Sequence, residues 1–247
     1  MTDAALFISD LHLTPERPFP VYLFYRFIEK VAPNASALYV LGDFLEAWVG
    51  DDTLSQPFHH DLAKALKALS ERGVALFFLS GNRDFLVGPA FAAAAGLTLL
   101  PDPARIDLFG TATLLSHGDQ FCTDDVAYQS FRRQVRDSAW QQQFLAQPLH
   151  QRLALAKALR ERSEHAKADK KPEIMDVNGA AISDMLNGPI AHPTPVQRII
   201  HGHTHRPARH DHLIDGRPIE RWVLPDWYEQ GGYLTCDAGG CRLSDFL

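Results

Sequence analysis

Short apolar runs recur along the chain, and each of them ends in a small polar loop. Such runs, bounded by glycine and polar residues, are typical of strands that are buried on both faces. They predict strands over residues 4–8, 37–41, 74–79, 111–115 and 196–200. Residues 21–31 and 62–69 instead place apolar side chains at three- and four-residue steps, which predicts amphipathic helices.

The order of these elements indicates the fold class. Strand, polar loop and helix alternate through the first part of the chain, and from residue 209 onward apolar and polar positions alternate between glycines. That last pattern is typical of antiparallel strands. Together the patterns predict an α/β protein whose sheets are covered by helices.

Residues 121–171 interrupt this rhythm, because they are predicted to be helical and are rich in Arg and Gln. Their large apolar side chains include Tyr128, Phe131, Trp140 and Phe144. We predict that this segment is an inserted helical cap, and that residues 1–120 and 172–247 form the main domain. The aromatic side chains have two open interpretations: they enclose an apolar ligand, or they pack against the main domain.

The charge of the chain is negative overall but unevenly distributed. Its 247 residues include 24 Lys and Arg and 30 Asp and Glu, a formal net charge of −6. This balance argues against nucleic acid as a partner, because general nucleic-acid binding needs a basic surface. Residues 126–171, however, hold ten Lys and Arg against four Asp and Glu. This basic segment is either a solvated helical surface or a surface for phosphate and anionic lipid headgroups.

The cysteines and the hydropathy bear on location. An odd number of cysteines, three, and no secretory leader predict a reducing compartment. We interpret Cys122 as a packing residue, while Cys236 and Cys241 have no histidine partners at zinc-finger spacing. No apolar run approaches the length needed to cross a bilayer, so the protein is expected to be soluble or peripheral to a membrane.

Polar side chains that can bind metal follow nearly every predicted strand. The carboxyl ends of strands in α/β sheets meet loops at one edge, where sites form. Five such ends supply Asp10, His12, Asp43, Asn82, His117, His203 and His205. Each block by itself is a weak signal, since Asp and Gly-Asn are also common in turns and helix caps. Their recurrence at five strand ends predicts a single metal site.

The chemistry of these groups indicates which ions they hold. All are carboxylate, amide or imidazole ligands, which suit Mn²⁺, Fe²⁺ or Zn²⁺. Seven groups are too many for one tetrahedral zinc ion, but they fit two ions that share a carboxylate. In Asp10-x-His12 and His203-x-His205, alternate residues of an extended chain point to the same side, so each pair can converge on the ions.

These blocks resemble the calcineurin-like metallophosphoesterase family. The resemblance spans positions 10 to 205 and rests on Asp10-x-His12, Gly42-Asp43, Gly81-Asn82-Arg83-Asp84, His117-Gly118-Asp119 and Gly202-His203-x-His205. It implies a four-layered α/β/β/α sandwich with a dinuclear centre. By the same resemblance one ion is held by Asp10, His12, Asp43 and His205. The second ion is then held by Asp43, Asn82, His117 and His203, with Asp43 bridging.

A finer resemblance is to a subgroup of this family whose substrate is UDP-2,3-diacylglucosamine. It rests on longer runs, at 7–13, 42–48, 117–125, 174–178 and 201–207. It implies metal-activated water attack at the phosphorus nearest uridine, giving UMP and the lipid 1-phosphate in lipid A biosynthesis of Gram-negative bacteria, with Mn²⁺. The cap would then cover the acyl chains. We expect a monomer, peripheral at the cytoplasmic side of the inner membrane.

The subgroup also suggests which residues contact the substrate. The implied contacts are Asn82, Arg83, Asp125, Ser163, Lys167, Lys170 and His203. Lys167 departs from the subgroup, where Asn or Thr is usual, and Asp125 is also interpretable as an ordinary helix N-cap. Asp43 and Arg83 are expected to be catalytic. A guanidinium is a poor acid but a bidentate phosphate ligand, which suits pyrophosphate cleavage because the leaving phosphate needs little protonation.

Two other functions remain open at this point. One is a metallophosphoesterase acting on another phosphodiester, such as a cyclic nucleotide or nucleic acid, or on a phosphoprotein. The basic, aromatic cap and Arg83 argue against it. The other is a non-catalytic scaffold, which would be expected to have lost some of the seven ligands. Asp84 and Asp119 are expected to orient ligand histidines rather than to bind metal.

Overall fold

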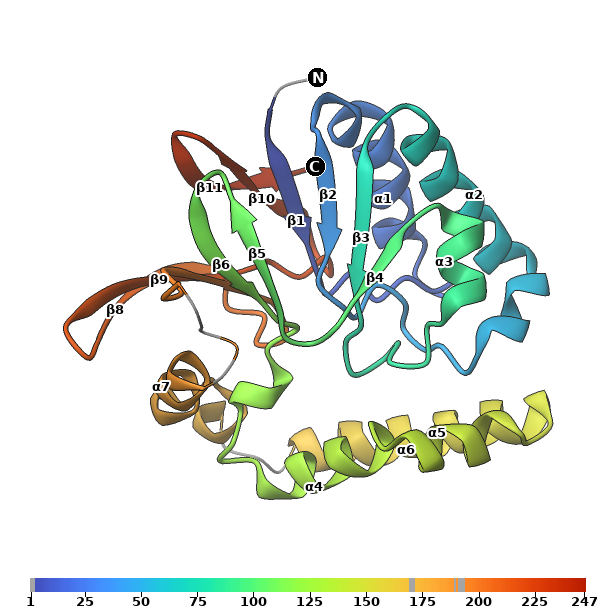
Figure 1. Ribbon diagram of the computed structural model, residues 1–247. Coiled ribbons are helices and arrows are strands. Elements are labelled where there is room, and N and C mark those ends of the chain that lie inside the picture. Colours follow the sequence, from blue (N-terminus) through green and yellow to red (C-terminus); the bar gives the residue numbers. More distant parts are fainter. Residues whose placement is uncertain (1–2, 169–171, 189, 191–193) are drawn as a thin grey trace.

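The strands form two sheets in the computed structural model, which describes residues 3–168, 172–188, 190 and 194–247 (Figure 1). The first sheet has the order β11-β10-β1-β2-β3-β4. Its strands are β1 (Ala5–Ile8), β2 (Ala37–Val40), β3 (Ala75–Leu79), β4 (Thr98–Leu100), β10 (Gly231–Asp237) and β11 (Gly240–Phe246). The second has the order β5-β6-β7-β9-β8. Its strands are β5 (Ala104–Leu108), β6 (Thr111–Leu115), β7 (Arg198–His201), β8 (Ala208–Ile214) and β9 (Arg217–Val223).

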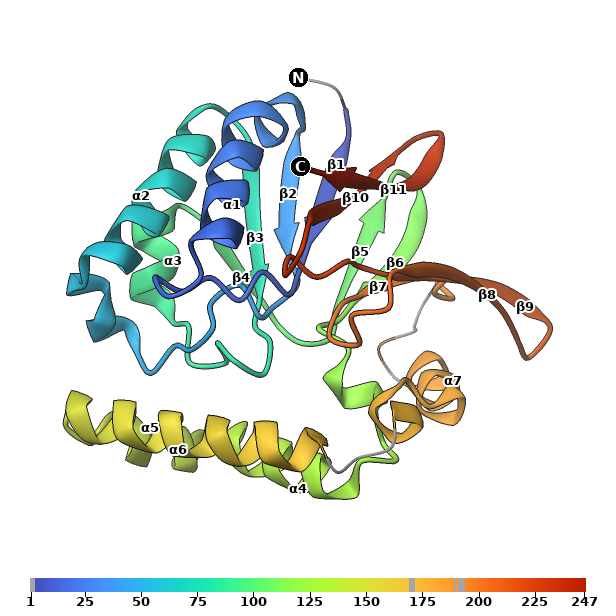
Figure 2. The same cartoon turned by 180° about the vertical axis from the view of Figure 1, so that it is seen from behind.

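The helices fall into two groups. The first group covers the sheets and comprises α1 (Pro18–Lys30), α2 (Pro57–Glu71), α3 (Pro89–Ala95) and α7 (Gly179–Asn187). The second group lies within the segment predicted to be a cap, hereafter called the cap, and comprises α4 (Val126–Val135), α5 (Ser138–Leu145) and α6 (Leu149–Ala168). Figure 2 shows α1–α3 on one face of the first sheet and α4–α6 together beyond its lower edge.

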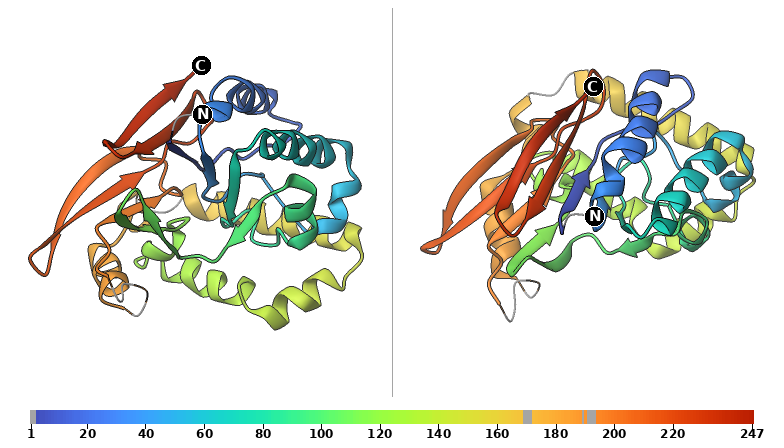
Figure 3. Two further views of the ribbon diagram at one scale, coloured as in Figure 1. Left: turned by 45° about the horizontal axis from the view of Figure 1, so that its top comes forward. Right: turned by 90° about the horizontal axis from the view of Figure 1, so that it is seen from above.

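Alternation of side chains along the strands explains the layers. On β1, Leu6 and Ile8 join the core under α1–α3, whereas Phe7 joins the core between the two sheets. On the second sheet, Leu115 faces that shared core, while Leu114 packs with side chains of α7. The result is the predicted α/β/β/α sandwich. Figure 3 shows α1 and α2 on the side of the first sheet that faces away from β8 and β9.

The strand directions bring the predicted loops together. β1, β2 and β3 pair in parallel, as do β6 and β7 of the other sheet. The loops after β1–β3 therefore leave the same edge of the first sheet, toward the side on which α4–α6 lie (Figure 1). The backbone amide of Ser116 donates to the carbonyl of Ile200 (3.1 Å), which ties the ends of β6 and β7 to each other.

The cap packs on the main domain as well as bounding a space. Phe144 is buried in the core under α1–α3, and Trp140 packs against that core. Trp140 also stacks on Phe144 with ring centroids 5.1 Å apart. The two interpretations of the cap aromatics are thus not exclusive, because Trp140 and Phe144 also line the cavity described below.

Some elements differ from the sequence-based prediction. The helix predicted over residues 21–31 begins at Pro18, since proline is compatible with a first helical turn. Among the α-helices and strands of the described residues, α3, α7, β4 and β5 were not predicted. β4 is three residues long and β5 carries charged side chains, so neither has the apolar run that marks a buried strand.

The cysteines also differ from expectation. Cys236 and Cys241 form a disulfide across the β10–β11 hairpin, where their Cα atoms are register partners. The odd number of cysteines predicted a reducing compartment, in which no disulfide is expected. The count of cysteines does not show which of them are adjacent, because that depends on the register of the paired strands. Cys122 is buried, as its interpretation as a packing residue requires. No helix in the described ranges is long and apolar enough to cross a membrane.

Candidate active site

The backbone at the strand ends has an uncommon conformation. Positive φ angles, between +49° and +69°, occur at Asp10, His12, Asp43, His203 and His205. Each such non-glycine residue costs on the order of 1 kcal/mol or more, and such strain clusters at functional sites. Hydrogen bonds between neighbouring loops stabilise this backbone conformation. The amide of Asp10 donates to the Gly42 carbonyl (3.1 Å), and the amide of His12 donates to the Asp43 carbonyl (2.8 Å).

Two glycines allow these loops to approach each other closely. A Cβ on Gly81 would lie 2.2 Å from Oδ1 of Asp43. A Cβ on Gly202 would lie 2.2 Å from Oδ2 of Asp10. Any side chain at either position would displace a carboxylate, so glycine is required here by space.

The first cluster of side chains comprises Asp10, His12 and His205, whose possible ligand atoms all lie within 4.8 Å of one another. Nε2 of His205 lies 3.3 Å from Oδ1 of Asp10. Both ring nitrogens of His12 and Oδ1 of Asp10 are buried and have no hydrogen-bond partner. Unsatisfied buried polar atoms are costly, so their convergence here fits a cation that would bind them.

The second cluster meets at one amide oxygen. Oδ1 of Asn82 lies 2.9 Å from Nε2 of His117 and 3.0 Å from Nδ1 of His203. Nδ1 of His117 is 2.9 Å from the carbonyl oxygen of Leu41, which orients the ring. When the imidazole of His117 is neutral and its Nδ1–H donates to Leu41, the lone pair of Nε2 faces the amide oxygen. A cation between Nε2 and the amide oxygen would satisfy both, because each offers a lone pair.

Asp43 lies between the two clusters. Its Oδ2 is 3.7 Å from Nε2 of His12, and its Oδ1 is 3.6 Å from Nε2 of His117. Oδ1 also accepts a hydrogen bond from the backbone amide of Arg83 (2.8 Å). Asp10, Asp43 and His117 form a second group whose possible ligand atoms lie within 4.8 Å of one another. The structure thus brings all seven predicted ligands together, from both sheets.

The pKa shifts of the clustered side chains are those of a site that favours positive charge. Burial would raise the pKa of Asp10, but the adjacent His205 ring holds that pKa well below its usual range. Burial and the charge of His117 lower the pKa of His203 to about 3. Burial opposes protonation of His117 too, yet the carboxylates of Asp43 and Asp10 raise its pKa to about 9. The concentrated carboxylate charge of Asp43 and Asp10 therefore favours a cation at this site.

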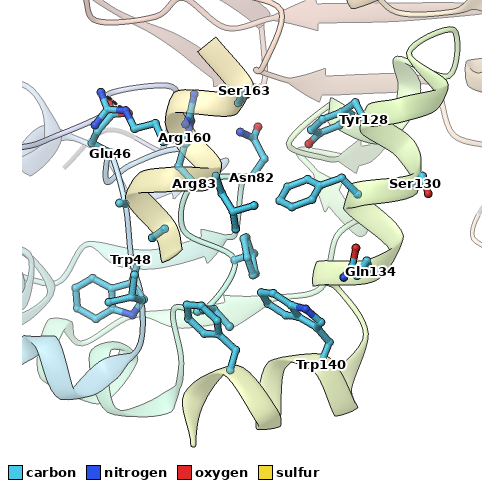
Figure 4. A pocket seen from close by; sticks show the side chains of 18 of the residues that line it. Glu46, Trp48, Asn82, Arg83, Tyr128, Ser130, Gln134, Trp140, Arg160 and Ser163 are labelled. Atoms are coloured by element: carbon cyan, nitrogen blue, oxygen red, sulfur yellow. Dashed lines mark ion pairs between the residues drawn. The ribbon is translucent and has the colours of Figure 1, made fainter. Parts of the chain in front are cut away.

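A cavity of about 440 Å³ opens beside the second cluster. The main domain contributes Glu46, Trp48, Asn82, Arg83 and Phe85 to its wall, and the cap contributes Tyr128, Phe131, Trp140, Phe144, Arg160 and Ser163. Figure 4 shows Asn82 and Arg83 between Tyr128 on one side and Glu46 with Arg160 on the other. The cavity is therefore polar where it meets Asn82 and lined by aromatic rings farther into the cap.

The predicted substrate contacts are found in different places. Asn82, Arg83 and Ser163 line the cavity. Asp125 caps α4, because its carboxylate accepts a hydrogen bond from the Tyr128 amide (3.1 Å). Lys170 and the side chain of Lys167 lie outside the described residues.

The prediction for Asp84 and Asp119 was wrong in its detail. Asp84 accepts hydrogen bonds from the backbone amides of Gly81 (2.7 Å) and Phe44 (2.8 Å), so it orients ligand loops rather than a histidine ring. Asp119 accepts from the hydroxyl of Tyr128 (2.7 Å). The pKa of Asp84 rises to about 6 through burial and the nearby Asp43 carboxylate.

Three residues near the first cluster were missed by the sequence analysis. The ring of Tyr228 stacks on His12 at a centroid distance of 5.3 Å. Oδ2 of Asp226 lies 3.4 Å from Nδ1 of His205, and Oε2 of Glu46 lies 3.6 Å from Nδ1 of His12. Asp226 and Tyr228 come from the far end of the chain, and no motif marks them. Glu46 lies three residues after Asp43, in the run 42–48 on which the finer resemblance rests.

The comparisons with known proteins agree with this geometry. The family model for calcineurin-like phosphoesterases matches residues 5–207. A protein of Aromatoleum aromaticum named UDP-2,3-diacylglucosamine hydrolase is 52% identical over 237 residues, covering 96% of this chain and 94% of that protein. A protein of the same name from Stenotrophomonas maltophilia is 51% identical over 242 residues, covering 96% of both chains. One from Aeromonas salmonicida is 49% identical over 242 residues, covering 97% of this chain and 92% of that protein.

Proposed function

The chain belongs to the calcineurin-like phosphoesterase family, and from this premise we propose that it hydrolyses the pyrophosphate bond of UDP-2,3-diacylglucosamine. The products are UMP and 2,3-diacylglucosamine 1-phosphate, known as lipid X. The reaction belongs to lipid A biosynthesis. The proposal includes attack of water at the phosphorus nearest uridine.

One observation carries this proposal: an apolar cavity and a cluster of phosphate-binding groups share a wall. Asn82 and Arg83 line the same space as Phe131 and Trp140. A substrate that is both anionic and acylated would place its phosphates against the first pair and its acyl chains against the second. A cyclic nucleotide or a phosphoprotein has no long acyl chain to bury against these rings, and burial of apolar surface favours binding in such a cavity.

The family implies divalent metal ions, and the buried ligand atoms of Asp10 and His12 that make no hydrogen bond fit them. In our proposal Asp10, His12, Asp43 and His205 would hold one ion, and Asp43, Asn82, His117 and His203 the other, both Mn²⁺. When bound, such a pair supplies Lewis acidity that neutralises phosphate oxygens and activates water as the nucleophile.

The protein's own residues have separate tasks. Asp43, held by the Arg83 amide, faces histidines of both clusters and would keep the two ions at a fixed separation. Asn82 is a neutral ligand and so limits negative charge where the phosphate arrives. Arg83 would bind the phosphate oxygens through its guanidinium, which cannot act as an acid but stabilises the departing phosphate. We propose further substrate contacts by Asp125, Ser163, Lys167, Lys170 and His203.

The location follows from the proposed substrate. A diacylated sugar nucleotide resides at a membrane surface, so the protein would contact the cytoplasmic side of the inner membrane as a peripheral protein. We also propose that it is a monomer. The described helices include none that could span the bilayer.

Product analysis tests the proposal. The protein is incubated with UDP-2,3-diacylglucosamine and Mn²⁺, and the expected products are UMP and the lipid monophosphate. UDP and a free acylated sugar would reject the site of cleavage. Cyclic nucleotide and single-stranded DNA serve as comparison substrates, and faster hydrolysis of either would reject the lipid substrate. A folded protein that hydrolyses none of them with Mn²⁺ would be the non-catalytic scaffold.

A further inference from the structure

One face of α4 carries three side chains that contact the main domain. Tyr128, Arg132 and the C-cap residue Arg136 follow each other at four-residue steps, which places them in one stripe along the helix. Arg133 lies off this stripe and is exposed. Each residue of the stripe contacts a loop that carries a residue of the second cluster, and Tyr128 and Arg132 share Asp119 of the His117 loop.

Arg136 contacts the turn that precedes Asn82. Its Nη1 donates to Oγ of Ser80 (2.9 Å), and its Nη2 donates to the carbonyl oxygens of Ser80 (3.2 Å) and Gly81 (3.0 Å). A planar guanidinium with donors in fixed directions can hold these three acceptors at once. The residue after Gly81 is Asn82, so the position of this amide depends on the turn that Arg136 holds.

Arg132 supports the loop that carries His117, through two carboxylates. Its Nε donates to Asp119 (2.9 Å) and its Nη2 to Oδ2 of Asp102 (3.1 Å). Oδ1 of Asp102 in turn accepts from Oγ of Ser116 (2.9 Å) and from the His117 amide (3.3 Å). Mutation of a side chain that hydrogen-bonds to a metal ligand typically lowers metal affinity or activity by roughly 10–100-fold.

Tyr128 contacts both the His117 loop and the loop that carries His203. Its hydroxyl donates to Asp119 (2.7 Å), and its ring stacks on His203 with a centroid distance of 5.8 Å. The three supported residues are those that meet at Oδ1 of Asn82, within 2.9 Å for His117 and 3.0 Å for His203. The first cluster instead contacts Glu46, Asp226 and Tyr228 of the main domain.

We propose that Tyr128, Arg132 and Arg136 are positioning residues for the metal site made by Asn82, His117 and His203. The cap helix α4 is then a structural part of the metal centre as well as a wall of the cavity. The assignment of a metal to these residues rests on the proposed function, whereas the contacts between α4 and the three loops do not.

The test uses Arg136→Ala with Arg133→Ala as the matched control on the same helix. Mn²⁺ binding is measured by calorimetry, and the coupled Mn²⁺ pair by electron paramagnetic resonance. We expect Arg136→Ala to keep one tight Mn²⁺ and to bind the second about tenfold more weakly or worse, with loss of the coupled signal. Arg133→Ala should match the wild type in both measurements.

Kinetics separate positioning from cavity shape. On both UDP-2,3-diacylglucosamine and the soluble bis(p-nitrophenyl) phosphate, kcat of Arg136→Ala should fall about tenfold at fixed Mn²⁺, while KM for the lipid changes less than about twofold. Arg136→Lys should recover part of kcat, because an ammonium keeps some of the three contacts. A raised KM for the lipid alone would mean that Arg136 only shapes the cavity.

Wild-type affinity for both Mn²⁺ ions in Arg136→Ala would overturn the proposal. Where that variant does not fold, Arg136→Lys and Ser80→Ala are measured instead, and unchanged affinity for the second ion in both would overturn it equally. The Mn²⁺ measurements need no substrate. If the wild type binds two Mn²⁺ ions but does not hydrolyse the lipid, the proposed function is rejected. The Mn²⁺ measurements would still decide whether Arg136 positions the metal site.

Discussion

The strand-end loops and the cap differ in how they are held. Asp10 and His117 are fully buried, and Asp43 is 2% exposed, on a backbone pinned by hydrogen bonds between neighbouring loops. The cap leaves Val126 72% exposed and Leu153 44% exposed. The proposed metal ligands thus lie in the buried interior, whereas part of the cavity wall that would contact the substrate belongs to a less buried helical segment.

The attachment of the cap to the main domain relies on arginines. Arg132 and Arg136 bind the main domain from α4, and the buried Arg152 of α6 binds Asp52 and the carbonyl of Val49. The sequence left open whether the basic cap residues form a solvated surface or meet phosphate. For these three the answer is neither, since their charges face the protein, while Arg133 remains at the surface.

The sharpest test of the interior is Asp43→Asn, because this carboxylate faces both clusters. Losing its charge removes several kcal/mol of electrostatic stabilisation, so kcat should fall by about 10³-fold. Steady-state hydrolysis at saturating Mn²⁺ measures it, with circular dichroism as the check on folding. A loss smaller than tenfold would show that Asp43 does not link the two clusters.

Gly81→Ala tests whether close approach of the loops matters. The added Cβ would collide with Oδ1 of Asp43, whereas the same change at Gly179 meets nothing within 4 Å. We expect Gly81→Ala to reduce activity roughly 10²-fold through the displaced ligand, and Gly179→Ala to behave as the wild type. Equal activities of the two variants would mean that the loop can relax.

The cap is tested by Phe131→Ala, since this ring lines the cavity. Removing a buried aromatic contact of about 1.5–3 kcal/mol should raise KM for the acylated substrate about tenfold or more, with little change for bis(p-nitrophenyl) phosphate. Leu153→Ala, at an exposed position of α6, is the control. Equal effects on both substrates would indicate general destabilisation instead.

His59 gives the smallest expected effect. It packs on Trp48, a cavity residue, and burial lowers the pKa of its ring. Below the ordinary histidine pKa of about 6.5 the unfolded chain binds the proton more readily, so this term destabilises the fold as pH falls. A difference of one full proton between the folded and unfolded states changes the free energy of unfolding by ~1.4 kcal/mol per pH unit. Because His59 is partly exposed, its contribution is a fraction of that slope. Urea unfolding of chelated protein between pH 5 and 7.5 should show a flatter slope in His59→Gln; identical slopes would contradict it.

The part of this protein that its sequence determined is local in origin. Five apolar runs predicted five of the strands, because a run buried on both faces leaves its mark in consecutive residues. The ligand side chains directly follow those runs, so parallel pairing alone brings Asp10, Asp43 and Asn82 to one edge. Helices without such a mark, such as the alanine-rich α3, were missed.

Contacts between distant segments were decided only by the tertiary structure. Tyr228 reaches His12, and Arg136 reaches the turn before Asn82, across spans that no periodicity links. Whether a basic residue faces solvent, a ligand or the protein depends on which helix face is covered, and packing of whole elements sets that. Residue type therefore specified the chemistry available, and packing specified which groups act together.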